Sequence, residues 1–415
     1  MKIHQPTQRF IHRRFACIGR VARAGRAVGI AVALLACAAS FAYADVVPSE
    51  QEKFRVRVVA TGLHYPWGMA FLPNGDLLVT EKVKGRLRLV RGIRDIDLVR
   101  GIRDIDGVSG GQLDPRPVIG LPDNIAFGGQ GGLLDVAVHP NFARNRLVYV
   151  SYSGSGPGGV GTEVARGQLR GYALENLQTI FTATPKTRGT GHYGSRLLFA
   201  ADGSLFITTG DRRHRLHDAQ DRSNHLGTVL RLNDDGSTPA DNPFISRDDA
   251  KPEIYSYGHR NGQGIALRPL DNSVWMHEHG PRGGDEVNKL DKPGANYGWP
   301  AITYGIDYSG RIISDQTHAP GMQQPVVYWS PSIAPSGMAF YHGDKFPNWR
   351  GDLFVGALKL RHLRRLEMRG DTVTAQEVLL DGIARIRDVA NGPDGYLYLI
   401  TDARRGRVLR LEPVE

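Results

Sequence analysis

The sequence predicts an all-β fold: a six-bladed β-propeller of four-stranded antiparallel blades. A turn rich in Pro, Asn, Asp and Gly, followed by a short alternating strand, occurs six times along the chain. The chain also holds 51 glycines and 24 prolines, which disfavour long helices, and helical periodicity is hard to find. Six such units suit six blades around an axis, whereas a β-sandwich would need about seven strands in a far shorter chain.

The six copies share β-branched and aromatic residues after the turn, as strands do. They are LPNGDLLVTE (72–81), HPNFARNRLVYVSY (139–152), AADGSLFITTGD (200–211), RPLDNSVWMHE (268–278), FPNWRGDLFVGA (346–357) and GPDGYLYLITD (392–402). Propellers commonly close by pairing the two chain ends in one blade. We expect FRVRVVATGL (54–63) and RVLRLEPVE (407–415) to pair in this way.

The first 44 residues read as an export signal, with seven basic residues, no acidic residue and the apolar run VGIAVALLACAASFA. Ala42 and Ala44 form a cleavage pattern, so we expect a mature propeller domain over 45–415. The run is shorter than the roughly 20 residues of a membrane span. Two alternatives stay open: a lipoprotein site at Cys37, and a twin-arginine signal at Arg13-Arg14-Phe15. Each predicts a periplasmic or secreted protein.

Removing this leader changes what the composition implies. The formal net charge of +10 falls by seven to +3, so the sequence gives no support for a nucleic-acid partner. Both cysteines, Cys17 and Cys37, lie in the leader. A mature chain without cysteine has neither disulfides nor thiolate metal ligands.

One segment departs from the repeat. LVRGIRDID at 89–97 occurs again, letter for letter, at 98–106. Fold constraints rarely produce such identity, so we interpret it as a tandem duplication tolerated in a surface loop. A functional lip over the mouth of the ring is the alternative.

Loops at one mouth of a propeller bring together residues that are distant in sequence. His192, in GTGHYGSRLLF, precedes the third repeat, and Asp211 ends the strand that follows. A lone histidine is more often a surface or packing residue. A carboxylate beside it would orient the imidazole and stabilise its protonated form, which is the arrangement of a catalytic base.

Polar and basic residues recur at comparable places in the other repeats. GHRNGQG (258–264) carries Arg260 and Asn261 between glycines, which is either an ordinary turn or a clamp for an anion or carbonyl. Gln130 lies in a glycine-rich run that lacks a Walker lysine or Rossmann spacing. Arg385 and Arg387 share one face of a strand and can grip carboxylates, and Lys359 adds a positive charge. Together they predict a site for a small polyanion with carbonyls.

HEHGPRGGDE (277–286) raises the question of a metal. Zinc sites favour His and Cys at regular spacing, often on a helix. Gly-Pro and Gly-Gly forbid a helix here and expose main-chain carbonyls. Calcium prefers such oxygens, with Asp285 or Glu286 in support, so the pattern favours calcium over zinc.

Five ordered motifs carry a resemblance to a known family: GQGGLLDVAVHP, GHYGSRLLF with ITTGD, YGHRNGQG, EHGPRGGDEVN with GANYGWP, and WSPSIAPSGMAFY. Together they resemble the soluble aldose sugar dehydrogenases that depend on pyrroloquinoline quinone (PQQ). The likeness runs from about residue 55 to the end. It implies a six-bladed propeller that oxidises the C1 hydroxyl of aldose sugars to the lactone.

The resemblance also implies roles. His192 resembles the base that removes the hydroxyl proton, Asp211 its partner, and Arg260 the group that stabilises charge on the quinone oxygen. The residues that match PQQ contacts are Gln130, Arg260, Asn261, Ser332, Lys359, Arg385 and Arg387. The carbonyls of Gly280 and Pro281 match the ligands of the calcium that polarises PQQ. Glu286 and the Tyr297 carbonyl resemble a second calcium site.

Departures from the family pattern concern the substrate. Ser330 stands where the glucose dehydrogenases have an aromatic residue, and their long loops are missing, so a more open pocket is expected. His279 replaces an amide of glucose-specific relatives. Reduced PQQ must pass electrons to an external acceptor, because nothing resembles a haem or iron–sulfur motif. A calcium-dependent sugar lactonase and a non-catalytic extracellular binding module remain as alternatives.

Overall fold

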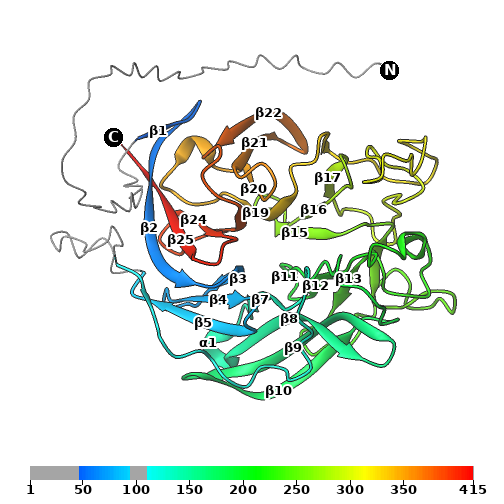
Figure 1. The fold of residues 1–415 in the computed structure, drawn as a ribbon, viewed down its shortest axis with the longest axis horizontal. Coiled ribbons are helices and arrows are strands. Elements are labelled where there is room, and N and C mark those ends of the chain that lie inside the picture. The colour runs from blue at the N-terminus through cyan, green and yellow to red at the C-terminus, as the bar shows by residue number, and fades with distance from the viewer. Residues whose placement is uncertain (1–45, 94–109, 415) are drawn as a thin grey trace, which may run out of the picture. The chain divides into compact units, whose positions relative to one another are not determined.

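The computed structural model describes residues 46–93 and 110–414, which form six antiparallel sheets and very little helix (Figure 1). The described helices are short: α1 (Phe142–Asn145) and two 3₁₀ turns, Leu216–Gln220 and Pro347–Trp349. The expected export signal lies outside the described residues, as does the expected duplication from residue 94 onward. The all-β prediction is confirmed.

Five sheets have four strands and one has five. From the innermost strand outward they are β3 (Pro66–Phe71), β4 (Leu77–Glu81), β5 (Arg86–Arg91) and β6 (Gln112–Leu113); β7 (Leu133–Val138), β8 (Leu147–Gly156), β9 (Gly159–Arg170) and β10 (Ala173–Thr182); β11 (Leu197–Phe199), β12 (Leu205–Thr208), β13 (Thr228–Leu232) and β14 (Ile254–Tyr257); β15 (Gly262–Leu267), β16 (Val274–Glu278), β17 (Asp285–Lys289) and β18 (Val327–Trp329); β19 (Pro335–Phe340), β20 (Leu353–Ala357), β21 (Leu363–Arg369) and β22 (Thr372–Leu379); and β23 (Ile386–Asn391), β24 (Leu397–Thr401), β25 (Gly406–Pro413), β2 (Lys53–Leu63) and β1 (Val47–Pro48). The two-residue β1 is the fifth strand of the last sheet.

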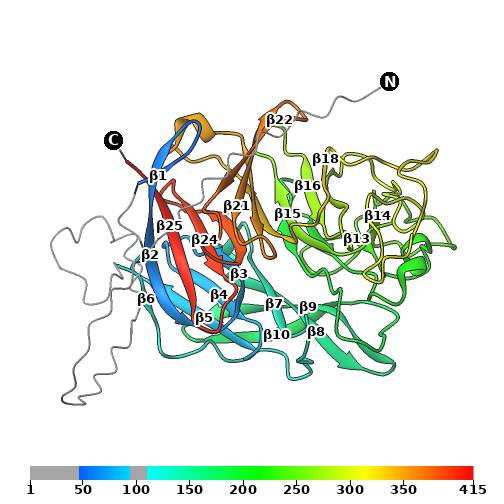
Figure 2. The same cartoon turned by 45° about the horizontal axis from the view of Figure 1, so that its top comes forward.

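The sheets form a closed ring through their first strands. β3 contacts β7, β7 contacts β11, and the series continues through β15, β19 and β23 back to β3. The ring closes as the sequence predicts, because β2 from the N-terminal side pairs with β25 from the C-terminal side, from Phe54 opposite Pro413 to Leu63 opposite Gly406. In Figures 1 and 2 the blue β2 runs along the red β25.

The six repeated units of the sequence are the turns into the second strands of the six blades. In five of them the residue two positions before the strand has a left-handed backbone: Gly75, Gly203, Asn272, Gly351 and Gly395, with φ from 57° to 92°. Glycine and asparagine adopt this conformation at low cost. The recurring Asn, Asp and Gly residues therefore form one turn geometry, repeated around the ring.

Antiparallel pairing places the functional residues at one end of the blades. The start of a first strand lies opposite the end of the second strand in each blade, as in Leu197 opposite Ile207 and Gly262 opposite Glu278. Residues just before a first strand and just after a second strand therefore meet at one mouth of the ring.

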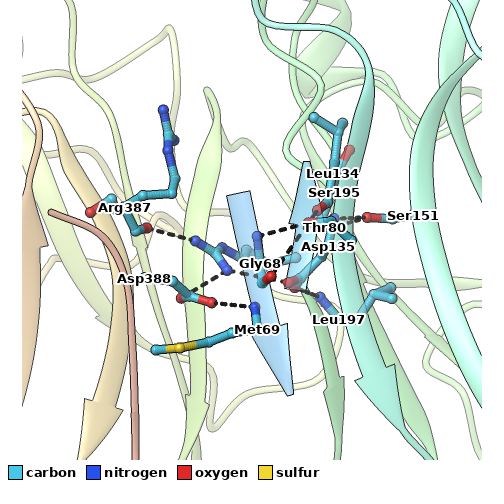
Figure 3. Close-up of polar contacts among 12 residues, drawn as sticks. Gly68, Met69, Thr80, Leu134, Asp135, Ser151, Ser195, Leu197, Arg387 and Asp388 are labelled. Carbon is cyan, nitrogen blue, oxygen red and sulfur yellow. Dashed lines mark hydrogen bonds and ion pairs between the residues drawn. The ribbon is translucent and has the colours of Figure 1, made fainter. Parts of the chain in front are cut away.

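The axis of the ring holds a polar network around Arg196. Its guanidinium contacts Asp388 at 2.9 Å and Asp135 at 3.3 Å, and it donates to the carbonyls of Gln263 (2.8 Å) and Arg387 (3.1 Å). It also lies over the Trp67 ring, 4.2 Å from the centroid. Figure 3 shows Asp388 reaching the Met69 N–H and Asp135 reaching the Leu197 N–H across this axis. One side chain thus ties together residues from five of the six blades.

Candidate active site

His192 and Asp211 form a buried pair at the mouth of the third blade. His192 Nδ1 lies 2.6 Å from Asp211 Oδ1, and the residues are 3% and 0% exposed. His192 precedes β11 and Asp211 follows β12, so antiparallel pairing brings them together across 19 positions. The His192 N–H also donates to Gln130 Oε1 at 2.7 Å, which links the pair to the second blade.

The electrostatic surroundings keep this imidazole neutral. Burial and the nearby Arg260 charge lower the pKa of His192 to about 4, although Asp211 acts in the opposite direction. Burial acts to raise the pKa of Asp211, but its bonds to His192 and to the Arg213 N–H outweigh that effect, and this pKa lies below its ordinary value. Near neutral pH the Nδ1 proton therefore points to an ionised carboxylate, and Nε2 presents a lone pair.

Arg260 lies beside this pair at the entrance to the fourth blade. Its Nη1 donates to the carbonyls of His279 (2.8 Å) and Gly280 (3.0 Å), and its main-chain N–H donates to Glu278. Behind it, His259 Nδ1 lies 2.8 Å from Glu278 Oε1 in a fully buried arrangement. The arginine is thus fixed by bonds at its backbone and at its guanidinium.

Asn261 follows Arg260 in the chain and contacts the loop that carries His192. Its Oδ1 accepts from the Gly194 N–H at 3.0 Å, whereas its Nδ2 has no partner among the described residues although the side chain is 1% exposed. A buried amide donor without a partner is costly. A ligand atom that accepts a hydrogen bond would therefore satisfy this donor.

In the 277–286 stretch both histidine rings contact main-chain carbonyls. His277 Nε2 contacts the Ser336 carbonyl, and His279 Nε2 lies 2.5 Å from the Pro335 carbonyl. Burial lowers the pKa of both histidines. Gly280 packs against Gly283 and Gly284 so closely that a Cβ would lie 2.1 Å from the Gly283 carbonyl oxygen.

The two acidic candidates in this stretch differ in environment. Asp285 accepts from the N–H groups of Gly280 (2.9 Å), Ile333 (2.7 Å) and Ala334 (3.0 Å), and from the Ser332 hydroxyl (2.9 Å). Asp285 therefore anchors the Gly280 loop, and Ser332, predicted to contact a cofactor, lies in the same network. Burial raises the pKa of Asp285 to about 6.

Glu286 lies on β17 and contacts Asn288 Nδ2 at 3.4 Å, and the same Nδ2 lies 3.4 Å from Glu278. Burial, with the Glu278 charge second, raises the pKa of Glu286 well above its ordinary value. Tyr297 stacks on His259 with ring centroids 4.7 Å apart. Among the described residues no group of three or more His, Cys, Asp or Glu side chains could hold a metal, so a site here would depend on carbonyl oxygens as well.

A cationic group lies at the ends of the fifth and sixth blades, and Lys82 of the first blade belongs to it. Arg385 and Arg387 both contact Asp402 Oδ2, at 2.8 and 3.2 Å, and Arg385 donates to the Leu358 carbonyl. The next residue, Lys359, is exposed. Arg387 is 6% exposed, and its Nε has no partner in the described part of the chain. Burial, partly offset by Asp402, lowers the pKa of Arg387.

Sequence reasoning missed two side chains of this site. Lys82, after β4, donates to the Gly129 carbonyl at 3.3 Å, and burial and the Arg387 charge lower its pKa. Its place after a second strand is the same as that of Lys359, and this was the available signal. Trp299 donates its indole N–H to Asp211 Oδ2 at 2.8 Å. No spacing rule places residues 88 positions apart in contact.

The predicted residues therefore fall into linked sets. Gln130, His192, Asp211, Arg260, Asn261 and Gly280 are joined by hydrogen bonds, and Ser332 joins Gly280 through Asp285. Arg385 and Arg387 meet at Asp402. Glu286 lies behind Arg260, linked to Glu278 by Asn288. Within the described residues, no helix has the length and apolarity to cross a membrane.

Comparisons with known proteins show which proteins this chain is similar to. Aldose sugar dehydrogenase YliI of Escherichia coli (strain K12) is 43% identical over 365 residues, covering 86% of this chain and 92% of the relative. The crystal structure of the E. coli soluble aldose sugar dehydrogenase in the apo-form matches with a TM-score of 0.78 at 40% identity, covering 87% of this chain and all of that one. The PQQ-bound form of aldose sugar dehydrogenase from Streptomyces coelicolor matches with a TM-score of 0.67 at 28% identity, covering 88% of this chain and 100% of the other.

The family description "Glucose / Sorbosone dehydrogenase" matches residues 63–410, which include five complete blades, the inner strands of the last blade and every residue of the His192 network. By sequence and by fold, this chain belongs to the glucose/sorbosone dehydrogenase family of oxidoreductases.

Proposed function

We propose that the protein oxidises the C1 hydroxyl of aldose sugars to the lactone, with calcium-bound PQQ as the hydride acceptor. The observation that carries the proposal is the neutral His192, bonded to Asp211 and set beside the buried Arg260, with the amide Nδ2 of Asn261 lacking a partner among the described residues. Similarity to the E. coli aldose sugar dehydrogenase and to the PQQ-bound aldose sugar dehydrogenase of S. coelicolor supports sugar oxidation and PQQ binding.

The cationic group fits the charge of the cofactor. Three cations, Lys82, Arg385 and Arg387, surround a single carboxylate side chain, that of Asp402. Positive charge therefore exceeds negative charge at this side of the mouth. PQQ carries three carboxylates, which would pair with these cations and with Lys359. Arg387 Nε and Asn261 Nδ2, both without a partner among the described residues, would gain acceptors.

The carbonyls of Gly280 and Pro281 would supply the oxygen donors that calcium prefers. The Gly280 carbonyl also accepts from Arg260 Nη1 at 3.0 Å, so calcium would share this oxygen with the arginine. The glycine packing at 280, 283 and 284 and the Asp285 bonds hold this loop in place. Glu286 and the Tyr297 carbonyl are proposed as a second calcium site. When bound, calcium-held PQQ supplies the two-electron acceptor for the hydride that leaves sugar C1.

The chain's own residues handle the proton. His192 Nε2 accepts the proton of the C1 hydroxyl while Asp211 stabilises the imidazolium that forms. Loss of that proton together with a hydride from C1 converts the ring hemiacetal to the lactone. Arg260, held by Glu278 and the 279–280 carbonyls, would supply positive charge to stabilise the bound acceptor as it gains electrons.

The decisive test adds PQQ and calcium to purified, EDTA-dialysed protein and follows reduction of an artificial dye with several aldoses. We expect dye reduction only when both are added, with lactone as the product. Absence of dye reduction under all conditions would exclude the dehydrogenase. Lactone hydrolysis in its place would identify the calcium-dependent lactonase, and failure to bind PQQ would favour the non-catalytic binding module.

We further propose that the chain is exported and passes electrons to an external acceptor. The basic, apolar leader supports export to the periplasm or medium. Mass spectrometry of the exported protein should give an N-terminus at Asp45. A lipid-modified N-terminus at Cys37 would identify the lipoprotein alternative.

A further inference from the structure

We propose that Trp299 is a positioning residue for the catalytic base, holding Asp211 through its indole N–H and Arg260 through its ring. The inference rests on the proposed dehydrogenase function and adds a residue to it. Trp299 lies in the long connection between β17 and β18, and it is 7% exposed.

The two oxygens of Asp211 have different donors. Oδ1 accepts from His192 Nδ1 at 2.6 Å and from the Arg213 N–H at 2.8 Å. Oδ2 accepts from the Trp299 indole at 2.8 Å, the one side-chain donor to this oxygen in the described part of the chain. With both oxygens bound, the carboxylate plane is fixed, and so is the direction in which it holds the imidazole.

The indole is itself held in place by its backbone. The Trp299 N–H donates to the Gly258 carbonyl at 2.8 Å, and its carbonyl accepts from Gln220 Nε2 at 2.7 Å. Gln220 and Asn296 exchange two side-chain hydrogen bonds, of 3.0 and 2.7 Å. The position of the indole therefore does not depend on a bound ligand.

The Trp299 ring also faces the other charged arm of the site. The Arg260 guanidinium carbon lies 5.3 Å from the ring centroid, within the range of a cation–π interaction. A single side chain thus sets the separation between the carboxylate that orients the base and the cation that faces the acceptor.

The indole bond also has an electrostatic consequence. A donor on Oδ2 disperses the carboxylate charge, which weakens the attraction of Asp211 for a protonated His192. Without the indole donor, Asp211 would hold that proton more strongly and the pKa of His192 would rise. The other charged or titratable groups around His192 are Arg260, Arg212, Arg213 and His279. A substitution that removes only the indole N–H and keeps an aromatic ring beside Arg260 is designed to leave these groups in place.

The test is Trp299→Phe, which removes the N–H and keeps an aromatic ring. NMR titration of the cofactor-free protein, with His192→Ala to assign the signal, should show the His192 pKa raised by about half a unit. With PQQ and calcium, kcat should fall about tenfold with little change in KM, because the carboxylate is free to rotate. The Kd for PQQ, measured by fluorescence titration, should stay within about twofold.

Trp275→Phe is the matched control, because it also removes one buried indole bond, to Ser273 Oγ at 2.9 Å, and lies outside the network. It should leave the His192 pKa and kcat unchanged. On an Asp211→Asn background, Trp299→Phe should add less than about twofold, because its effect passes through Asp211. Should the Phe variant fail to fold, site-specific β-(3-benzothienyl)alanine removes the N–H while preserving the indole shape.

A raised His192 pKa together with non-additivity supports the inference. An unchanged pKa and unchanged kcat in a folded variant would overturn it while leaving the dehydrogenase in place. Equal losses in the Asp211→Asn and native backgrounds would also overturn it. If the native protein reduces no dye with any aldose, the proposed function and this inference fail together.

Discussion

At His192 the backbone is part of the site geometry. Its φ of +52° lies in the left-handed region, which residues other than glycine rarely adopt, at a cost of roughly 1–2 kcal/mol. The bond from its N–H to Gln130 Oε1 and the bond from its ring to Asp211 hold this conformation. The imidazole therefore has little freedom to turn away from the mouth.

The first residue-scale prediction concerns the base. His192→Ala should reduce kcat by at least about 10³-fold, because it removes the imidazole proposed to accept the hydroxyl proton. The Kd for PQQ should remain similar, because the cationic group is untouched. His139→Ala is the control. His139 belongs to the second repeat and contacts Asp234, outside the His192 network, so this variant should keep full turnover. Retained turnover in the His192 variant would remove that residue from its role.

The second concerns the orienting carboxylate. Asp211→Asn should lower kcat about 10²- to 10³-fold without releasing PQQ, because the amide cannot stabilise the imidazolium. If the Asn amide oxygen still accepts from His192 Nδ1, it should favour the protonated imidazole more than Ala does. As pH is lowered, the Asp211→Asn variant should then lose its remaining activity at a higher pH than the Asp211→Ala variant. Steady-state kinetics between pH 4 and 9 measures this, and native kinetics would contradict the pairing.

At the scale of elements, the turns before the second strands decide the register of each blade. Gly203 has a φ of +85°, and a Cβ at this position would have no atom within 4 Å. A substitution there therefore tests backbone strain alone. Gly203→Ala should lower the free energy of unfolding by about 1–2 kcal/mol. Gly203→Asn should lower it by less, because Asn272 adopts the same conformation in the fourth blade. Urea denaturation measures both free energies of unfolding. Equal losses in the Ala and Asn variants would contradict the turn assignment.

The pairing of the first and second strands in each blade explains where the site lies. Lys82, Asp211, Gly280, Lys359 and Asp402 each follow a second strand. Gln130, His192, Arg260, Ser332 and Arg385 each precede a first strand. Antiparallel pairing therefore brings both groups to one mouth, which is why chemistry-bearing residues recur at equivalent places in the repeats.

At the scale of the whole molecule, the axial Arg196 offsets two buried carboxylates. Burial raises the pKa of Asp135 to about 7, with Arg196 opposing the shift and Asp388 adding to it; burial also raises the pKa of Asp388. A raised folded-state pKa means that stability is fully present below the ordinary value of 3.8 and is lost as pH rises through about 7.

Arg196→Met should therefore destabilise the ring by about 3–5 kcal/mol near neutral pH, because two buried carboxylates lose their cation. The destabilisation should shrink as pH falls toward 4, where both carboxyls become protonated. Thermal or urea unfolding at several pH values measures this. A destabilisation that is the same at every pH would show that packing against Trp67, rather than charge, is what the arginine provides.

Much of the molecule follows from the sequence. The number of blades, the strand after each turn, the pairing of the chain ends and the motif residues can all be predicted, because turn chemistry and alternation act over a few neighbouring positions. The His192–Asp211 pairing was predicted for the same reason, because the two residues flank adjacent strands of one blade.

Only the tertiary structure decides the contacts between blades. The indole of Trp299 on Asp211, the cations Lys82 and Arg387 near one carboxylate, and Arg196 across the axis depend on the closed ring. Residues such as 211 and 299 are brought together by the rotation from one blade to the next, which no local pattern records. The sequence alone therefore determined the blades and the residue types at their mouth, and ring closure decided which of those residues touch.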